Sequence, residues 1–168
     1  NMKNFKIFII LLAFLFFPIK SYGLIEVDIT RGNLNPLPIA VSPLSIDEKS
    51  KKSFENLLKK KNIGEEISSI VENNLKTSGL FNPLSKDAFL QAPDIANLKP
   101  RFEDWNLIKA QALITGKVTN VDEKLRVEFR LWDVLAGKEM MALAFTTVPT
   151  NWRRVGHIIS DKVYERLT

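Results

Sequence analysis

The chain has 168 residues, with 24 lysines and arginines against 19 aspartates and glutamates, one histidine and no cysteine. The lack of cysteine excludes disulfides, thiol catalysis and the lipidated cysteine of a bacterial lipoprotein. The formal net charge of +5 would favour a nucleic-acid partner, but Lys3, Lys6 and Lys20 all lie at the amino-terminal end. Without these three, 21 basic residues face 19 acidic ones, so nucleic-acid binding loses most of its support.

Residues 1–23 have the pattern of a secretory signal peptide. Two lysines precede the uncharged run Ile7–Phe17, which is shorter than the about 20 apolar residues that span a bilayer. Ser21 and Gly23 place small residues three and one before an expected cleavage between Gly23 and Leu24. An uncleaved membrane anchor is the alternative, and the short apolar run disfavours it. We therefore expect export to the periplasm, no stable membrane insertion after cleavage, and a mature chain of about 145 residues with one core.

The start of the mature chain has the alternation of a half-buried strand. Ile25, Val27 and Ile29 alternate with polar residues. A terminal segment with one apolar face either pairs with the sheet or stays loose. After turn residues at 31–36, the run 37–44 predicts a short buried strand with proline near both ends.

Charged residues dominate 45–61, where the apolar spacing predicts a short surface helix. Its lysines suggest an acidic partner, although a solvated face is the more common reason for such a run. The next helix is expected at Ile63–Thr77, with Asn62 as its cap, Glu65 completing a capping box and Gly79 in the left-handed conformation after it. An extended piece at 80–84, an irregular stretch at 85–100 and one or two helical turns at Phe102–Ile108 follow.

Three consecutive strands are predicted at Ala112–Val121, Leu125–Val134 and Met140–Val148, joined by short reversals at 122–123 and 135–138. In the second strand the odd positions 125–131 are apolar and the even positions between them are charged. This alternation predicts that one face of the strand is buried and the other is exposed to solvent. The last helix begins at about Trp152 with Asn151 or Thr150 as its cap. It reaches Thr168 with no glycine or proline stop at its end, which favours a longer parent chain.

The order of these elements predicts an α/β (α+β) sandwich of two layers. A mixed sheet of about five strands carries two main amphipathic helices on one face, in the manner of an anticodon-binding-domain-like fold.

Convergent reactive groups are not evident in the sequence, and we expect no catalytic, cofactor-binding or metal-binding residues. His157 is the only histidine, and with Trp152 it is a candidate interface residue. The three tryptophans are expected to pack in the core or at an interface. The alternative hypothesis is a periplasmic ligand-binding or hydrolytic domain that uses a cleft near Trp105 and His157.

Several stretches together resemble one family, the amino-terminal domain of TolB, the periplasmic component of the Tol-Pal system of Gram-negative bacteria. The most specific are Asn-x-Leu-x-x-Ser-Gly-x-Phe, at 73–81, and Gly-His-x-x-Ser-Asp-x-x-Tyr-Glu-x-Leu-Thr, at 156–168. The others are 24–29, 38–44, 82–84 and 112–118.

The resemblance implies a parent protein with this α/β domain at 37–168 and then a six-bladed β-propeller, which the chain lacks and which would carry most of the contact with the lipoprotein Pal. It implies that the segment 24–36 binds the carboxy-terminal domain of TolA, in support of envelope integrity and outer-membrane constriction at cell division. The chain departs from the enterobacterial pattern at Glu26, Asp28 and Arg31, and 47–61 resembles an insertion. The expected partner-binding residues are Leu24, Ile25, Glu26, Val27, Asp28, Ile29 and Thr30.

A further alternative is an assembly factor for an outer-membrane secretion channel, which would have a similar α/β build without the propeller. Repeats of about 40 residues with four short strands each, beyond Thr168, would distinguish a propeller parent from it.

Overall fold

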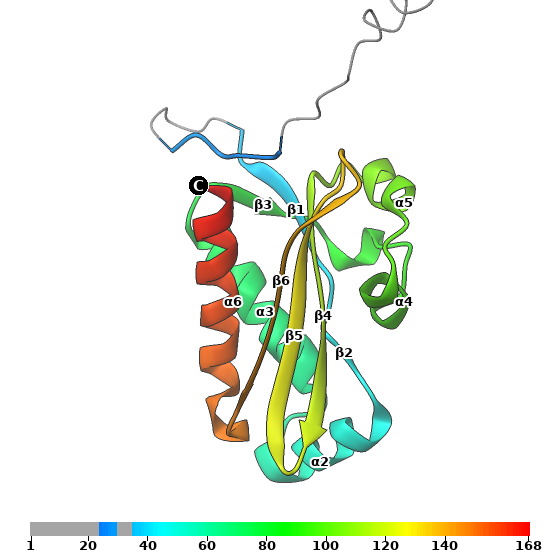
Figure 1. Cartoon of the computed structure of the whole chain (residues 1–168), viewed down its shortest axis with the longest axis vertical. Coiled ribbons are helices and arrows are strands. Elements are labelled where there is room, and N and C mark those ends of the chain that lie inside the picture. Colours follow the sequence, from blue (N-terminus) through cyan, green and yellow to red (C-terminus); the bar gives the residue numbers. More distant parts are fainter. Residues whose placement is uncertain (1–23, 30–34) are drawn as a thin grey trace, which may run out of the picture.

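The computed structural model describes residues 24–29 and 35–168, which form a mixed sheet with helices on both faces (Figure 1). The strands are β1 (Leu37–Val41), β2 (Ser45–Ile46), β3 (Phe81–Pro83), β4 (Ala112–Val121), β5 (Lys124–Asp133) and β6 (Lys138–Thr147). The helices are α2 (Glu48–Leu58), α3 (Ile63–Thr77), α4 (Pro93–Leu98), α5 (Phe102–Leu107) and α6 (Trp152–Leu167), with 3₁₀ turns η1 (Lys86–Ala88) and η2 (Pro149–Asn151). Two of the predictions lie outside the described residues. They are the signal peptide, which includes Gly23, and the partner-binding residue Thr30.

The sheet has the order β3-β1-β4-β5-β6, and β2 pairs with the second half of β4. The pairs β1–β3, β1–β4 and β2–β4 are parallel, whereas β4–β5 and β5–β6 are antiparallel. The predicted three-strand meander is therefore confirmed. Asp122 and Glu123 both have positive φ, 50° and 63°, as the tight hairpin turns that suit the twist of a sheet require.

Helices α3 and α6 cover one face of this sheet, as the alternation of β5 predicts. Buried side chains of both helices meet the inward side chains of β1, β4 and β5 in the main core. The two helices approach closely at Gly156, where a Cβ would lie 2.7 Å from Ile70 Cγ2. Helix α3 has the predicted bounds, and the side chain of Asn62 accepts a hydrogen bond from the N–H of Glu65.

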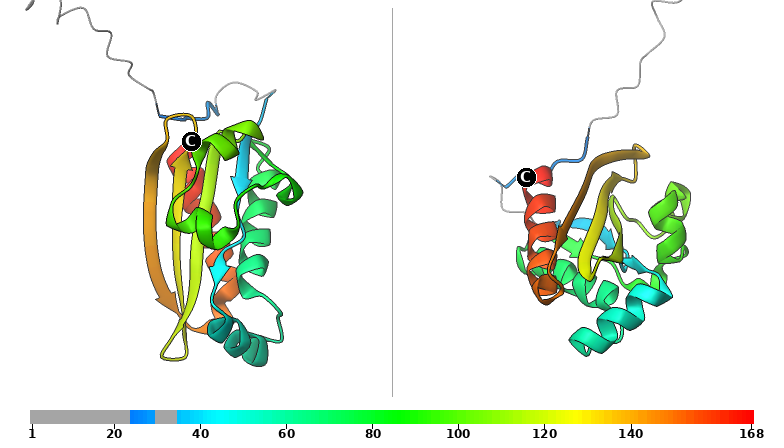
Figure 2. Two further views of the ribbon diagram at one scale, coloured as in Figure 1. Left: turned by 90° about the vertical axis from the view of Figure 1, so that its right-hand side faces the viewer. Right: turned by 60° about the horizontal axis from the view of Figure 1, so that its bottom comes forward.

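The opposite face carries a smaller layer that the sequence did not predict. Helices α4 and α5 lie in front of the sheet in the left view of Figure 2, with α6 behind it. Their residues Ala96 and Trp105 pack on Leu113 of β4 in a second core cluster. The expectation of an irregular stretch throughout 85–100 is wrong for α4, because Pro93 occupies the first turn of that helix, where its missing N–H costs nothing.

Of the two arrangements left open for the amino-terminal segment, the strand is not formed in its described part, 24–29. Asn151 occupies the predicted cap position of α6, but its side chain makes no capping hydrogen bond, and its Nδ2 donates to Thr147 Oγ1. The preceding η2 turn leads directly into the helix. Within the described ranges, no helix is long and apolar enough to cross a membrane.

Candidate site of the amino-terminal segment

The segment 24–29 lies at the end of the sheet where α6 terminates, close to the carboxyl end of the described chain (Figure 1). The N–H of Val27 donates a hydrogen bond of 2.7 Å to the carbonyl oxygen of Leu167, the last residue of α6. The final carbonyls of a helix have no partner within the helix. The amino-terminal segment therefore supplies a donor to an otherwise unpaired helix end.

A second backbone contact ties the segment to the sheet through Asp133. This buried residue is the last of β5, and its Oδ1 accepts a hydrogen bond of 2.9 Å from the N–H of Ala136 in the following turn. Its Oδ2 accepts a longer one, of 3.3 Å, from the N–H of Ile25. Sequence reasoning missed Asp133. The hydrogen bond of Asp133 to the following turn could be predicted, because Asp is common at the start of turns. Its contact with Ile25, 108 positions earlier in the chain, has no signal in the local sequence.

The apolar side chains of the segment divide between the core and the surface. Val27 is only 6% exposed and belongs to the main core, and Ile25 packs against that core. Leu24 and Ile29 are more than half exposed, and residues 26–29 line an open surface pocket together with Thr168. The predicted partner-binding residues 24–29 thus form one contiguous patch. Within it, the side chains of Ile25 and Val27 already pack on the core of the domain.

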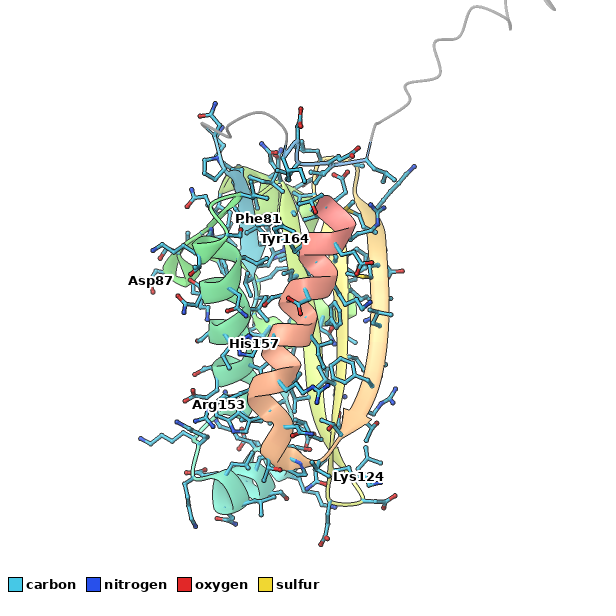
Figure 3. The ribbon with its side chains drawn as sticks, turned by 90° about the vertical axis from the view of Figure 1, so that its left-hand side faces the viewer. Phe81, Asp87, Lys124, Arg153, His157 and Tyr164 are labelled. Carbon is cyan, nitrogen blue, oxygen red and sulfur yellow. The ribbon has the colours of Figure 1, made fainter. Side chains whose placement is uncertain are left out.

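The other two candidate interface residues lie on α6, away from the segment. Trp152 is buried in the core, and the guanidinium carbon of Arg153 lies 4.3 Å from the centre of its ring. His157 is exposed, and its Nδ1 lies 2.8 Å from Nδ2 of Asn74 on α3. Figure 3 shows His157 and Arg153 along the same helix. These residues join α6 to its neighbours.

The hypothesis of a cleft near Trp105 and His157 is wrong. Trp105 is buried in the α4–α5 cluster, where its Nε1 donates to Gln91 Oε1. His157 belongs to α6 on the other face of the sheet (Figures 1 and 3). Among the described residues, no group of three or more His, Cys, Asp or Glu side chains could hold a metal ion.

Comparisons with known proteins identify the family of the chain. Residues 25–140 match the family model of the TolB amino-terminal domain. The chain is 80% identical over 157 residues to the Tol-Pal system protein TolB of Pelagibacter ubique, a match that covers 94% of this chain and 35% of the relative. The chain thus spans about a third of the length of that relative.

Two solved structures share the fold. A crystal structure of TolB from Acinetobacter baumannii matches with a TM-score of 0.63 and 22% identity, over 85% of this chain and 31% of that one. The hypothetical protein CT253 of Chlamydia trachomatis matches with a TM-score of 0.58 and 14% identity, over 79% and 98%. From the family model and the Pelagibacter relative, the chain belongs to the TolB amino-terminal domain family of the Tol-Pal system.

Proposed function

We propose that the chain is a non-catalytic, periplasmic protein-interaction domain, and that its residues 24–30 form a detachable segment that binds the carboxy-terminal domain of TolA. The observation that carries the proposal is the way in which 24–29 is attached. The segment lies on the domain without joining the sheet, and backbone hydrogen bonds of Ile25 and Val27 and the buried Val27 side chain contribute to holding it.

Rough magnitudes indicate that this attachment is marginal. Full burial of one valine side chain stabilises by about 1.5–3 kcal/mol, and a typical hydrogen bond adds a net of about 1 kcal/mol. Ordering the backbone costs about 1–2 kcal/mol for each residue. Since six residues are ordered while Val27 alone among them has a buried side chain, these gains do not exceed the cost of ordering, and the segment can be released from the domain.

A free segment has the properties of a strand that adds to an exposed sheet edge. Ile25, Val27 and Ile29 would then lie on one side of the added strand, and main-chain hydrogen bonds would supply the affinity. When the segment is docked on its own domain, the Val27 side chain and the N–H groups of Ile25 and Val27 are already occupied. The two arrangements therefore exclude each other, and a partner shifts the population toward the free state.

Membership of the TolB amino-terminal domain family supports a wider role. The domain would help to link the inner-membrane Tol complex to Pal at the outer membrane, and so support envelope integrity and constriction at division. Contact with Pal would come mainly from the part of the full-length relatives that this chain does not cover.

The test is calorimetric titration of the TolA carboxy-terminal domain into the chain that begins at Leu24 and into a variant that begins after Thr30. The proposal predicts that truncation abolishes binding and leaves a cooperative thermal transition. Undiminished binding by the truncated protein would overturn it. The matched control is Leu98→Ala, because Leu98 is exposed on α4, away from the segment.

A further inference from the structure

One end of the domain gathers positive charge, on elements that are far apart in the sequence. We name it the basic end, and it comprises Lys49, Lys51, Lys52, Lys59, Lys60, Lys61, Lys124, Arg153 and Arg154. Asn120, at the end of β4, donates its N–H to Ser50 Oγ of α2, and Lys60 Nζ lies 5.8 Å from the ring centre of Trp152 at the start of α6. These contacts bring α2, the β4–β5 turn and the start of α6 together, as Figure 3 shows for Lys124 and Arg153.

The charge of the basic end differs in sign from that of the remaining domain. The acids on the same elements and in the adjoining first turn of α3 are Asp47, Glu48, Glu55, Glu65, Glu66, Asp122 and Glu123, so nine basic residues face seven acidic ones. The remaining described residues contain 11 basic and 12 acidic side chains. The domain is therefore weakly polarised, although its overall charge is close to zero.

Carboxylates do not neutralise these cations within the domain. The ion pairs that the described residues form lie elsewhere: Lys86–Glu72, Arg101–Asp104, Arg126–Glu128, Arg130–Glu139 and Lys162–Glu165. Asp47 accepts from Ser50 as the cap of α2. The nine side chains of the basic end take no part in these ion pairs, and two of them, Lys60 and Arg153, lie over the Trp152 ring.

Exposed aliphatic side chains stand among these cations. Leu57 on α2 is 60% exposed, and Val121 and Val148, at the ends of β4 and β6, are exposed at the same end of the domain. Charge alone would suit any polyanion, but cations that surround protruding aliphatic side chains are the combination that binds the interface of an anionic bilayer.

We propose that the basic end binds the surface of an anionic phospholipid bilayer, with lysines on headgroup phosphates and Leu57 at the boundary of the acyl chains. Seven of the nine cations are lysines, whose compact ammonium groups on flexible stems can follow mobile headgroup phosphates. Each basic residue near such a surface raises the partition coefficient by about fivefold. The docked amino-terminal segment is bound at the other end of β5, so it would face away from the bilayer.

The role of charge in binding is tested by co-sedimentation of the protein with two kinds of vesicle. One kind is anionic, made of phosphatidylglycerol and phosphatidylethanolamine, and the other is neutral, made of phosphatidylcholine alone. The chain from Leu24 should bind the anionic vesicles and not the neutral ones, and binding should weaken with salt. Lys52→Glu/Lys61→Glu should lower the partition coefficient by more than about tenfold. The control Lys76→Glu/Lys99→Glu, the same charge change on exposed lysines outside the basic end, should lower it by less. Equal losses, or no binding to anionic vesicles, would overturn the proposal.

Leu57→Ser distinguishes a bilayer from other anions. It should lower binding to anionic vesicles several-fold, while Leu98→Ser, at an exposed leucine on α4, should leave it unchanged. Inorganic phosphate should compete no better than chloride at equal ionic strength. If Leu57→Ser has no effect, or if inorganic phosphate alone displaces the protein, the surface recognises soluble anions or an acidic protein and the bilayer proposal fails. Thermal melts show that each variant is folded.

Discussion

The N–H of Val27 donates a 2.7 Å hydrogen bond to the carbonyl oxygen of Leu167, which joins the start of the described chain to the last residue of its final helix. The bond gives the amino-terminal segment a defined resting place at the carboxyl end of α6. It also places Val27 in the core, where the side chain is unavailable to a partner.

Val27→Asp should release the segment, because a carboxylate cannot be buried in the main core without a large penalty. Hydrogen exchange at the backbone N–H of Ile25 should become fast, while the amides of β4 and β5 keep their protection. Leu98→Asp is the matched control, since it introduces the same charge at an exposed leucine. Persistent protection at Ile25 in the Val27→Asp variant would mean that other contacts hold the segment.

Asp133→Asn should weaken docking and also destabilise the domain. The amide retains one acceptor oxygen, so either Ala136 or Ile25 loses its partner. An unsatisfied buried group costs about 1–3 kcal/mol, which denaturant unfolding measures. If docking competes with TolA binding, the variant should bind the TolA domain at least as tightly as the parent chain. Weaker binding would indicate that Asp133 holds the segment in its binding-competent form.

Gly156→Ala should destabilise the contact between α3 and α6. The added Cβ would lie 2.7 Å from Ile70 Cγ2 and 2.8 Å from Ile70 Cβ, and overpacking of this kind costs about 1–3 kcal/mol. The better helix propensity of alanine offsets about 1 kcal/mol of that. The double variant Gly156→Ala/Ile70→Ala should lose less stability than the two single changes added together. Strict additivity in chemical unfolding would show that the clash is relieved elsewhere.

Asp47 should give stability that depends on pH. Its pKa is lowered from the ordinary value, chiefly by the hydrogen bond from the Ser50 hydroxyl and then by the one from the Ser50 N–H. A lowered folded-state pKa means that the contribution is complete above the unfolded pKa of about 3.9 and is lost as pH falls through the folded value. Asp47→Ala should cost about 1 kcal/mol at neutral pH, whereas Asp47→Asn, which keeps a capping oxygen, should cost less and remove this part of the acid dependence. Identical acid unfolding of the parent and Asp47→Asn would contradict this.

Local patterns were sufficient to predict most of the fold. The stripe and cap of α3, the alternation of β5 and the turn at Asp122–Glu123 each express a short-range rule, and each is confirmed. The contacts of the candidate site are long-range. The alternation of Ile25, Val27 and Ile29 indicates one apolar face, but it cannot show whether that face meets a strand, the end of a helix or solvent. The bonds to Asp133 and Leu167 depend on the assembled sheet and on the length of α6.

The most direct measurement of the central claim is calorimetric titration of a synthetic peptide of residues 24–35 into the TolA carboxy-terminal domain, beside a scrambled peptide and the chain from Leu24. If the segment is the binding element and docking competes with its release, the peptide should bind at least as tightly as the whole chain, because no docked state has to be undone. The scrambled peptide should not bind. A peptide that fails to bind while the whole chain does would contradict the account and place the interface on the folded domain.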